Sequence, residues 1–296
     1  MAQKWTFSVV ALIFLAGSGW LGYGVQQHIR AYRAAREAYA EKMDYKRRLA
    51  DLAAWFGDGK DKSDEAELET LKAEMENASS KAGMLAVFWG VVAVIFAIFS
   101  WLFARRAGNT VWLKTGLLLI ALACLYPGLS APMLEISAYE QNLEIPIKLK
   151  TSFFSLDIDK TQVFEGEMYF YYQSKSVLEL IGLLFRQHNW LVGVSILLFS
   201  VLIPVGKTGL SIWSALSRRM PKSGLLRWLM LRAGKWSMAD VFVVAVFLAF
   251  LAFNNMQAGI ETQSRILPGM YFFMAYVLIA VGVSSLMTGT SPDENV

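Results

Sequence analysis

The sequence is poor in the residues that form disulfides and metal sites. Among its 296 residues there is one cysteine, Cys124, and there are two histidines, His28 and His188. A single cysteine excludes an intrachain disulfide and a CxxC metal knuckle. Neither histidine has a cysteine or a paired carboxylate at ligand spacing, and no serine is marked as activated. We therefore predict no metal, no cofactor and no enzyme.

A nucleotide-binding loop is also missing, although the chain contains Gly-Lys-Thr at 206–208. The P-loop pattern G-x-x-x-x-G-K-[ST] requires a glycine where this chain has Val201. The tripeptide also follows Pro204 inside an apolar run, whereas a P-loop follows a strand and opens a soluble helix. The sequence argues against nucleotide binding here, so Lys207 needs another explanation.

Hydrophobic residues are abundant instead, at 55% of the chain, against about 45–50% in soluble domains. A membrane-spanning helix needs about 20 apolar residues. We predict an all-α polytopic membrane protein with six transmembrane helices, the first an uncleaved span because no clear A-x-A cleavage site follows it. The net charge of +4 fits basic cytoplasmic loops and does not imply nucleic acid. The apolar runs are roughly 5–27, 84–104, 115–134, 189–216, 238–258 and 267–289.

Two predicted loops, 105–114 and 214–235, contain basic residues and no acidic ones. Positive charge collects in short cytoplasmic loops. This favours both termini in the cytoplasm, with 28–83 and 135–186 outside, in a multi-pass inner-membrane protein. One observation opposes it, because residues 28–50 carry seven basic residues against three acidic ones. Long loops translocate largely regardless of charge, so the two short loops decide.

Segment 28–83 is predicted to form a charged periplasmic helical hairpin with arms at 28–56 and about 64–81. The stretch GDGKDKSDE at 57–65 provides the turn and the start of the second helix. The first arm is basic and the second is acidic, so they attract. The hairpin either joins two spans or docks an envelope partner. Apolar residues at 3-4-3 spacing predict a coiled-coil-like seam along the second arm: Leu68, Leu71, Met75 and Ala78.

Segment 135–186 has a different pattern, in which apolar and polar residues alternate along LEIPIKLKTSFFSLDID at 143–159. The alternation changes phase after Phe153, which predicts two strands or one strand with a bulge. MYFYYQ at 168–173 is a further strand candidate. A small periplasmic β-sheet is therefore expected here. It is followed by a short interfacial helix at 176–187.

Two ionisable residues fall inside predicted spans four and five. Lys207 lies about 9 Å along its helix from Trp213, and Asp240 lies about 6 Å beyond Trp236. The two spans run antiparallel and are joined by a basic loop, so both charges should lie at a similar depth near the cytoplasmic leaflet. A charge inside the bilayer costs about 2.5–3.5 kcal/mol or more and usually faces a partner or a wet cavity.

Three explanations of this pair remain open. Lys207 snorkels to headgroups while Asp240 caps its helix, or the two form an ion pair, or Lys207 lines a site for an anionic headgroup. Ser237 is a competing cap residue, which weakens the capping role of Asp240. Pro204 removes the hydrogen bond to the Ser200 carbonyl and should bend the span one turn before Lys207.

The second half of the chain, about 110–290, resembles the paraquat-inducible protein A family. The resemblance implies a bacterial inner-membrane protein linked to moving lipids across the envelope, typically with partners that carry MCE domains. It carries over Lys207 and Asp240 as candidate lipid-binding residues, with Pro204 and Ser237 as their local context. The stretches that carry it are PGLSAPMLEI (127–136), SVLELIGLLF (176–185), SVLIPVGKTGL (200–210), GKWSMADVFVVA (234–245) and PGMYFF (268–273).

The chain departs from better-known members, which usually duplicate the four-span unit and often carry zinc-ribbon cysteines. We predict two domains: 1–104, two spans joined by the hairpin 28–83, and 105–296, a single four-span unit with the β insert 135–186. The expected function is handling or transfer of lipid with an MCE-domain-type partner. The alternative is a non-transporting membrane scaffold or stress-response assembly factor that works through the hairpin.

Overall fold

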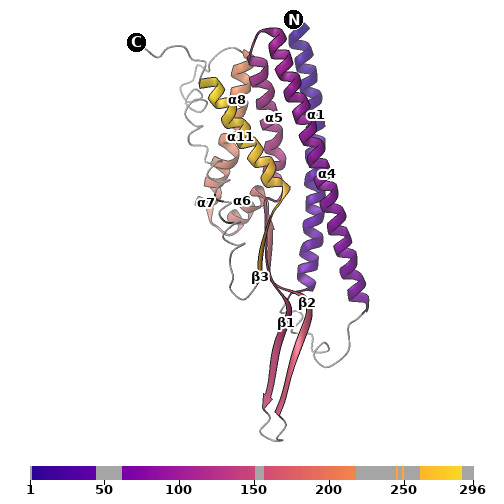
Figure 1. The fold of residues 1–296 in the computed structure, drawn as a ribbon. Coiled ribbons are helices and arrows are strands. Elements are labelled where there is room, and N and C mark those ends of the chain that lie inside the picture. Colours follow the sequence, from indigo (N-terminus) through magenta and orange to yellow (C-terminus); the bar gives the residue numbers. More distant parts are fainter. Residues whose placement is uncertain are drawn as a thin grey trace.

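The computed structural model describes residues 2–44, 62–150, 157–217, 245, 249 and 261–288. Within these ranges the protein is mostly helical, with one antiparallel sheet at the end opposite to the N-terminus (Figure 1). The helices are α1 (Ala2–Lys42), α4 (Lys62–Ala107), α5 (Val111–Ser130), α6 (Val177–Arg186), α7 (Trp190–Ile196), α8 (Ile203–Ser217) and α11 (Pro268–Thr288). The strands are β1 (Leu134–Lys150), β2 (Asp157–Lys175) and β3 (Glu261–Ile266).

Helices α1 and α4 form a long antiparallel hairpin along one side of the molecule (Figure 1). At about 1.5 Å per residue they extend roughly 60 and 70 Å, about twice the thickness of a bilayer's hydrocarbon core. Each predicted span and its neighbouring hairpin arm are therefore one uninterrupted helix. The predicted helical hairpin is confirmed for residues 28–42 and 62–83, whereas its turn, in 45–61, lies outside the described residues.

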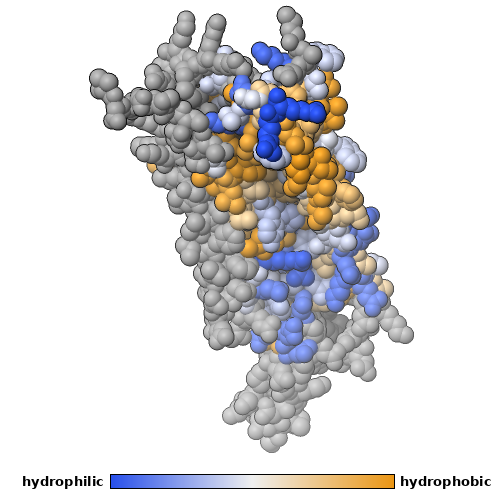
Figure 2. Space-filling model, turned by 45° about the horizontal axis from the view of Figure 1, so that its top comes forward, coloured by the Kyte–Doolittle hydropathy of each residue, from blue (hydrophilic) through white to orange (hydrophobic). Residues whose placement is uncertain are grey.

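An apolar belt surrounds the upper part of the helices. Its exposed large apolar side chains run from Trp5 to Tyr23 on α1 and from Met84 to Leu102 on α4. Each stretch covers about 28 Å, close to the roughly 30 Å of the hydrocarbon core. Figure 2 shows this hydrophobic band, with hydrophilic residues above it and over the part of the molecule below it. This pattern is that of a membrane protein with polar regions on both sides.

The described residues contain four helices that are long and apolar enough to cross a membrane, by length and composition, where the sequence predicted six. The fifth predicted span, 238–258, lies outside the described residues except for 245 and 249. The sixth corresponds to α11, which contributes only the shorter apolar stretch Pro268–Val283. The four helices are Lys4–Lys42, Ala66–Ala107, Val111–Ser130 and Trp190–Ser214.

The fourth of these helices is irregular in its middle. Between α7 and α8 the backbone adopts a π-helical turn, Leu197–Leu202, and the N–H of Ile203 donates to the carbonyl of Leu198. Pro204, which has no N–H to donate, follows directly, so the irregularity predicted at this proline is present as a widened turn. Lys207 lies within the helix that follows. Gly-Lys-Thr is therefore helical, which agrees with the argument against a nucleotide loop.

The sheet has the strand order β2-β1-β3, and all pairings are antiparallel. The predicted phase change corresponds to two strands, β1 and β2, while 151–156 lie outside the described residues. The predicted third strand, 168–173, is the end of β2 rather than a separate element. Strand β3 was not predicted, because its sequence Glu-Thr-Gln-Ser-Arg-Ile contains one apolar residue and shows no alternation.

Helix α5 packs tightly against α11 at Gly128. A Cβ atom built on this glycine would lie 2.9 Å from the backbone nitrogen and 3.0 Å from the Cα of Phe273. Backbone atoms do not move aside as a flexible side chain does, so only glycine allows this approach.

We expect Gly128→Ala to lower the free energy of unfolding by about 1–3 kcal/mol, the usual range for overpacking. The matched control is Gly17→Ala on α1, where an added Cβ meets no atom within 4 Å. Thermal unfolding of both variants in detergent tests this. Equal melting temperatures for the two variants would show that the α5–α11 contact is not tight.

Candidate functional site

The predicted residues Lys207 and Pro204 both lie in α8, where Pro204 is fully buried and Lys207 is half-buried. Asp240 and Ser237 lie outside the described residues. Among the residues that the structure does describe, Lys207 has no ion-pair partner. The pairing of Lys207 with Asp240 therefore stays a prediction.

Lys207 is next to a buried polar face of its helix. Ser200, Thr208 and Ser211 are each at most 5% exposed, and their spacing puts them on the side of the helix that also carries Pro204. Helix α8 packs against α5. Polar side chains within apolar helices usually face a partner helix or a wet cavity, so this face is suited to a functional role.

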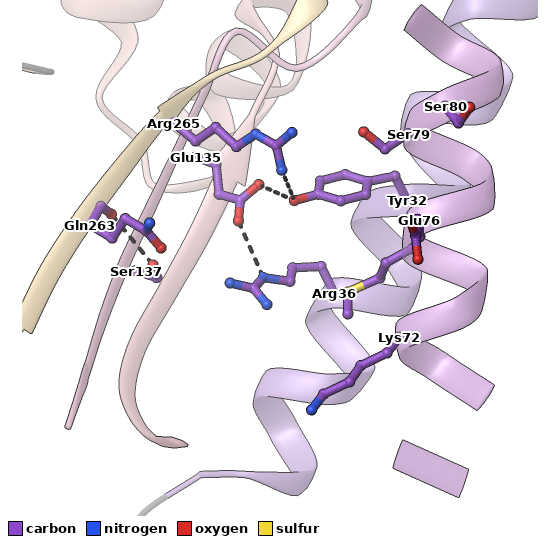
Figure 3. Close-up of a pocket in the computed structure, with 11 residues that line it drawn as sticks. Tyr32, Arg36, Lys72, Glu76, Ser79, Ser80, Glu135, Ser137, Gln263 and Arg265 are labelled. Atoms are coloured by element: carbon purple, nitrogen blue, oxygen red, sulfur yellow. Dashed lines mark hydrogen bonds and ion pairs between the residues drawn. The ribbon is translucent and has the colours of Figure 1, made fainter. Parts of the chain in front are cut away.

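A second group of charged residues, not predicted as a site, lies below the apolar belt. Glu135, at the start of β1, has a side chain that is only 4% exposed. Its carboxylate accepts hydrogen bonds from the Tyr32 hydroxyl at 2.9 Å and from Arg36 Nε at 3.3 Å. Arg265 of β3 donates to the Tyr32 hydroxyl at 3.4 Å, as Figure 3 shows. We call Tyr32, Arg36, Glu135 and Arg265 the Glu135 cluster.

Aromatic rings enclose the Arg36 end of this cluster. The Arg36 guanidinium lies 5.4 Å from the ring centre of Tyr169 and 5.9 Å from that of Tyr39. Both distances allow cation–π attraction. Burial, reinforced by the negative charge of Glu135, raises the pKa of Tyr172 nearby. The raised pKa keeps this hydroxyl protonated at physiological pH, and it is buried with no hydrogen-bond partner among the described residues.

A further ion pair joins α1 to α6. Arg33 bonds to Glu179, which also takes part in the capping box of α6: its backbone N–H donates to Ser176 Oγ, and its carboxylate accepts from the Ser176 N–H. Burial alone would raise the pKa of Glu179, but the hydrogen bonds from Arg33 and Ser176 outweigh it and lower that pKa. The predicted helix at 176–187 is thus confirmed as α6.

The predicted seam of the hairpin is confirmed, and it does more than join two helices. Leu68, Leu71, Met75 and Ala78 pack in one cluster with α1 residues and with tyrosines of the sheet. The end of α1 also pairs with β2, because the Tyr169 N–H donates to the Met43 carbonyl at 2.8 Å. The hairpin is therefore fixed to the sheet by apolar packing as well as by charge.

These contacts enclose a cleft of about 630 Å³ between α1, α4, β1 and β3. A second cavity of about 480 Å³ adjoins it on the side of the apolar belt. Three residues line both cavities: Tyr32, Ser79 and Arg265. The cleft is further lined by charged residues, namely Arg36, Lys72, Glu76 and Glu135. Besides the three shared residues, the second cavity is lined by Ser264 and by Ile29, Gly83, Ile266, Leu267, Pro268 and Tyr271.

One face of α4 supplies a wall to both cavities. Lys72, Glu76, Ser79 and Gly83 are spaced 4-3-4 and so follow one another on successive turns. A Cβ at Gly83 would meet no atom within 4 Å. Along this wall the charged side chains of Lys72 and Glu76 are followed by the hydroxyl of Ser79 and then by Gly83, which has no side chain. The exposed apolar residues of α4 begin at the next position, Met84.

The Glu135 cluster escaped prediction because its members come from three segments of the chain, α1, β1 and β3, and Glu135 is 99 and 103 positions from its partners Arg36 and Tyr32. Two signals could have pointed to it. Val25, Ile29, Tyr32 and Tyr39 follow a heptad pattern on α1, which marks a buried face beyond the apolar run. Glu135 also lies within one of the quoted family stretches, PGLSAPMLEI. In the described ranges no three His, Cys, Asp or Glu side chains converge, so no metal site is assigned there.

Removing Arg36 should leave the buried Glu135 carboxylate with an uncompensated charge. Breaking a buried pair from one side costs about 3–5 kcal/mol. Because the Arg36 side chain retains 17% exposure, we expect Arg36→Met to lower the free energy of unfolding by an amount at the lower end of this range. The control is Arg30→Met, at an exposed position of the same helix, which should be near neutral. In Arg36→Met/Glu135→Leu, stability should partly return, as measured by chemical denaturation; no recovery would contradict the pairing.

The comparisons with known proteins agree with the sequence motifs. Residues 162–289 match the family model described as Paraquat-inducible protein A. No curated protein and no solved structure matches the chain. The matched region contains Glu179, Lys207 and Arg265, whereas α1, α4 and Glu135 lie before it. The chain thus carries a paraquat-inducible protein A region at residues 162–289, which confirms the resemblance over those residues.

Proposed function

We propose that this chain is a multi-pass protein of the bacterial inner membrane that handles or transfers lipid across the envelope, with an MCE-domain-type partner. Three features support the proposal: the family region at 162–289, the four apolar helices and the two adjoining cavities. The basic, acid-free loop at 105–114 lies at the same end as the N-terminus (Figure 1). It supports a cytoplasmic location of that end, with the sheet on the other side.

The observation that carries the proposal is the position of the cavities. A lipid has an apolar and a polar part, and a site for it needs both environments in contact. The second cavity borders the belt at Gly83 and Tyr271 and has Ile29, Leu267 and Pro268 in its lining. The cleft, with its charged residues, adjoins it through Tyr32, Ser79 and Arg265. An acyl chain entering from the membrane at this edge would thus have its headgroup beside the cleft.

In this proposal Lys207 lies toward the other edge of the apolar belt, away from the two cavities. Helix α8 rises from α7 toward the end where α1 begins (Figure 1), so Lys207 is separated from the Glu135 cluster along the membrane normal. In our proposal Lys207 binds an anionic headgroup or pairs with Asp240 on the cytoplasmic side. The two sites would then serve the two leaflets of one membrane.

A membrane scaffold that works through segment 28–83 is the second candidate. It is favoured by one observation, the extension of α1 and α4 well beyond the apolar belt. A scaffold needs no lipid in its cavities. Lipid retention therefore separates the two functions.

We expect Gly83→Leu to fill the second cavity and reduce the lipid that the protein retains through extensive detergent washing, measured by mass spectrometry per mole of protein. The substitution should not destabilise α4, because leucine is a better helix former than glycine. The control is Gly90→Leu, two turns further along the same helix, where the added Cβ also meets no atom within 4 Å. Equal lipid in both variants and wild type would favour the scaffold.

A further inference from the structure

We propose that the charged cleft is a binding site for a zwitterionic phospholipid headgroup, with its phosphate at Arg265 and Ser79 and its ammonium group at Glu76. The inference rests on the proposed function and deepens it, because it names the lipid class and the residues that select it. It concerns the cleft between the N-terminal hairpin and the sheet, and it does not involve Lys207.

The phosphate position follows from the boundary between the two cavities. A phospholipid carries its phosphate between the acyl chains and the outer part of the headgroup. The residues that line both cavities, Tyr32, Ser79 and Arg265, mark the same boundary in the protein. Of these, Arg265 offers a guanidinium and Ser79 a hydroxyl group, and both are donors that bind phosphate oxygens well.

Arg265 has donors to spare for such a ligand. Among the described residues its side chain donates a hydrogen bond, 3.4 Å long, to the Tyr32 hydroxyl, whereas a guanidinium has five N–H donors. The Tyr32 hydroxyl in turn donates to Glu135. This chain holds the Arg265 side chain at the rim of the cleft, where it is exposed. In Figure 3 one terminal nitrogen of Arg265 bonds to Tyr32, and the other makes no contact with the residues drawn, so it can face a phosphate.

The ammonium position follows from the order of residues on α4. Glu76 lies one turn before Ser79, about 4.5 Å along the helix axis, a separation that an ethanolamine unit spans. Lys72, the nearest cation on the same face, has its ammonium 5.6 Å from the ring centre of Tyr39. Within the described ranges Glu76 forms no ion pair, and it is one of the residues that line the cleft.

The same charges favour a headgroup that carries an ammonium group besides its phosphate. The cleft is lined by three cations and two carboxylates. Arg36 neutralises Glu135, and in this proposal Arg265 takes the phosphate, which leaves Glu76 and Lys72, whose ammonium lies over the Tyr39 ring. Glu76 is then the charge that distinguishes headgroups by the group attached to the phosphate. A glycerol headgroup gains nothing from it, whereas an ethanolamine headgroup gains an ion pair. Because Glu76 is exposed, the preference should be moderate.

The experiment incubates the purified full-length protein with mixed micelles that contain equal amounts of phosphatidylethanolamine and phosphatidylglycerol with identical acyl chains. The retained lipids are then quantified by mass spectrometry. We expect wild type to prefer phosphatidylethanolamine by about two- to fivefold, the range for a partly exposed charge pair. Glu76→Gln should abolish the preference, and Arg265→Gln should reduce the retention of both lipids.

The matched controls are Glu74→Gln and Lys81→Gln, at exposed positions of α4 that do not line either cavity. Both should behave as wild type, and size-exclusion profiles check that all variants are folded. Retention of both lipids in equal amounts by wild type, or an unchanged ratio in Glu76→Gln, would overturn this inference and leave the proposed function intact. Retention of neither lipid by wild type would overturn both.

Discussion

The buried carboxylate of Glu135 is the constraint on which the arrangement of this protein depends. It stands at the point where α5 ends and the sheet begins, and a buried charge without partners would be strongly destabilising. Its partners, Tyr32 and Arg36, come from α1. Helix α1 must therefore continue well past the apolar belt, and α4 follows it as the other half of the hairpin. The cleft between the hairpin and the sheet is a consequence of this contact.

The same contacts explain a charge pattern that opposes the predicted topology. Residues 28–50 are strongly basic, which by itself suggests the cytoplasmic side. Arg33 and Arg36 instead pair with Glu179 and Glu135. Part of the basic charge of the hairpin thus compensates acidic residues of the segment 135–186. These arginines are needed where the hairpin meets the sheet, so their charge does not indicate a cytoplasmic location. The two acid-free loops remain the better guide to orientation.

The sequence could predict the elements that depend on local pattern. Alternation in 143–159, with its change of phase, indicated two strands or one with a bulge, and the structure has the two strands β1 and β2. The 3-4-3 spacing from Leu68 indicated the seam. It could not predict β3, which has one apolar residue and is held by pairing with β1. Nor could it predict the Glu135 cluster, because Tyr32 and Glu135 are 103 positions apart. Lys207 stood out as a charge in an apolar run, but its relation to Asp240 depends on residues outside the described ranges.

In our interpretation the Arg36–Glu135 contact holds the hairpin against the sheet and so forms the cleft. The most direct test of this interpretation is a spin-label distance across the cleft, between Ser80→Cys on α4 and Gln263→Cys on β3, in a Cys124→Ala background. We expect one narrow distance distribution, and a broad or longer one when Arg36→Met is added to folded, membrane-inserted protein. An unchanged narrow distribution in the Arg36→Met protein would contradict it.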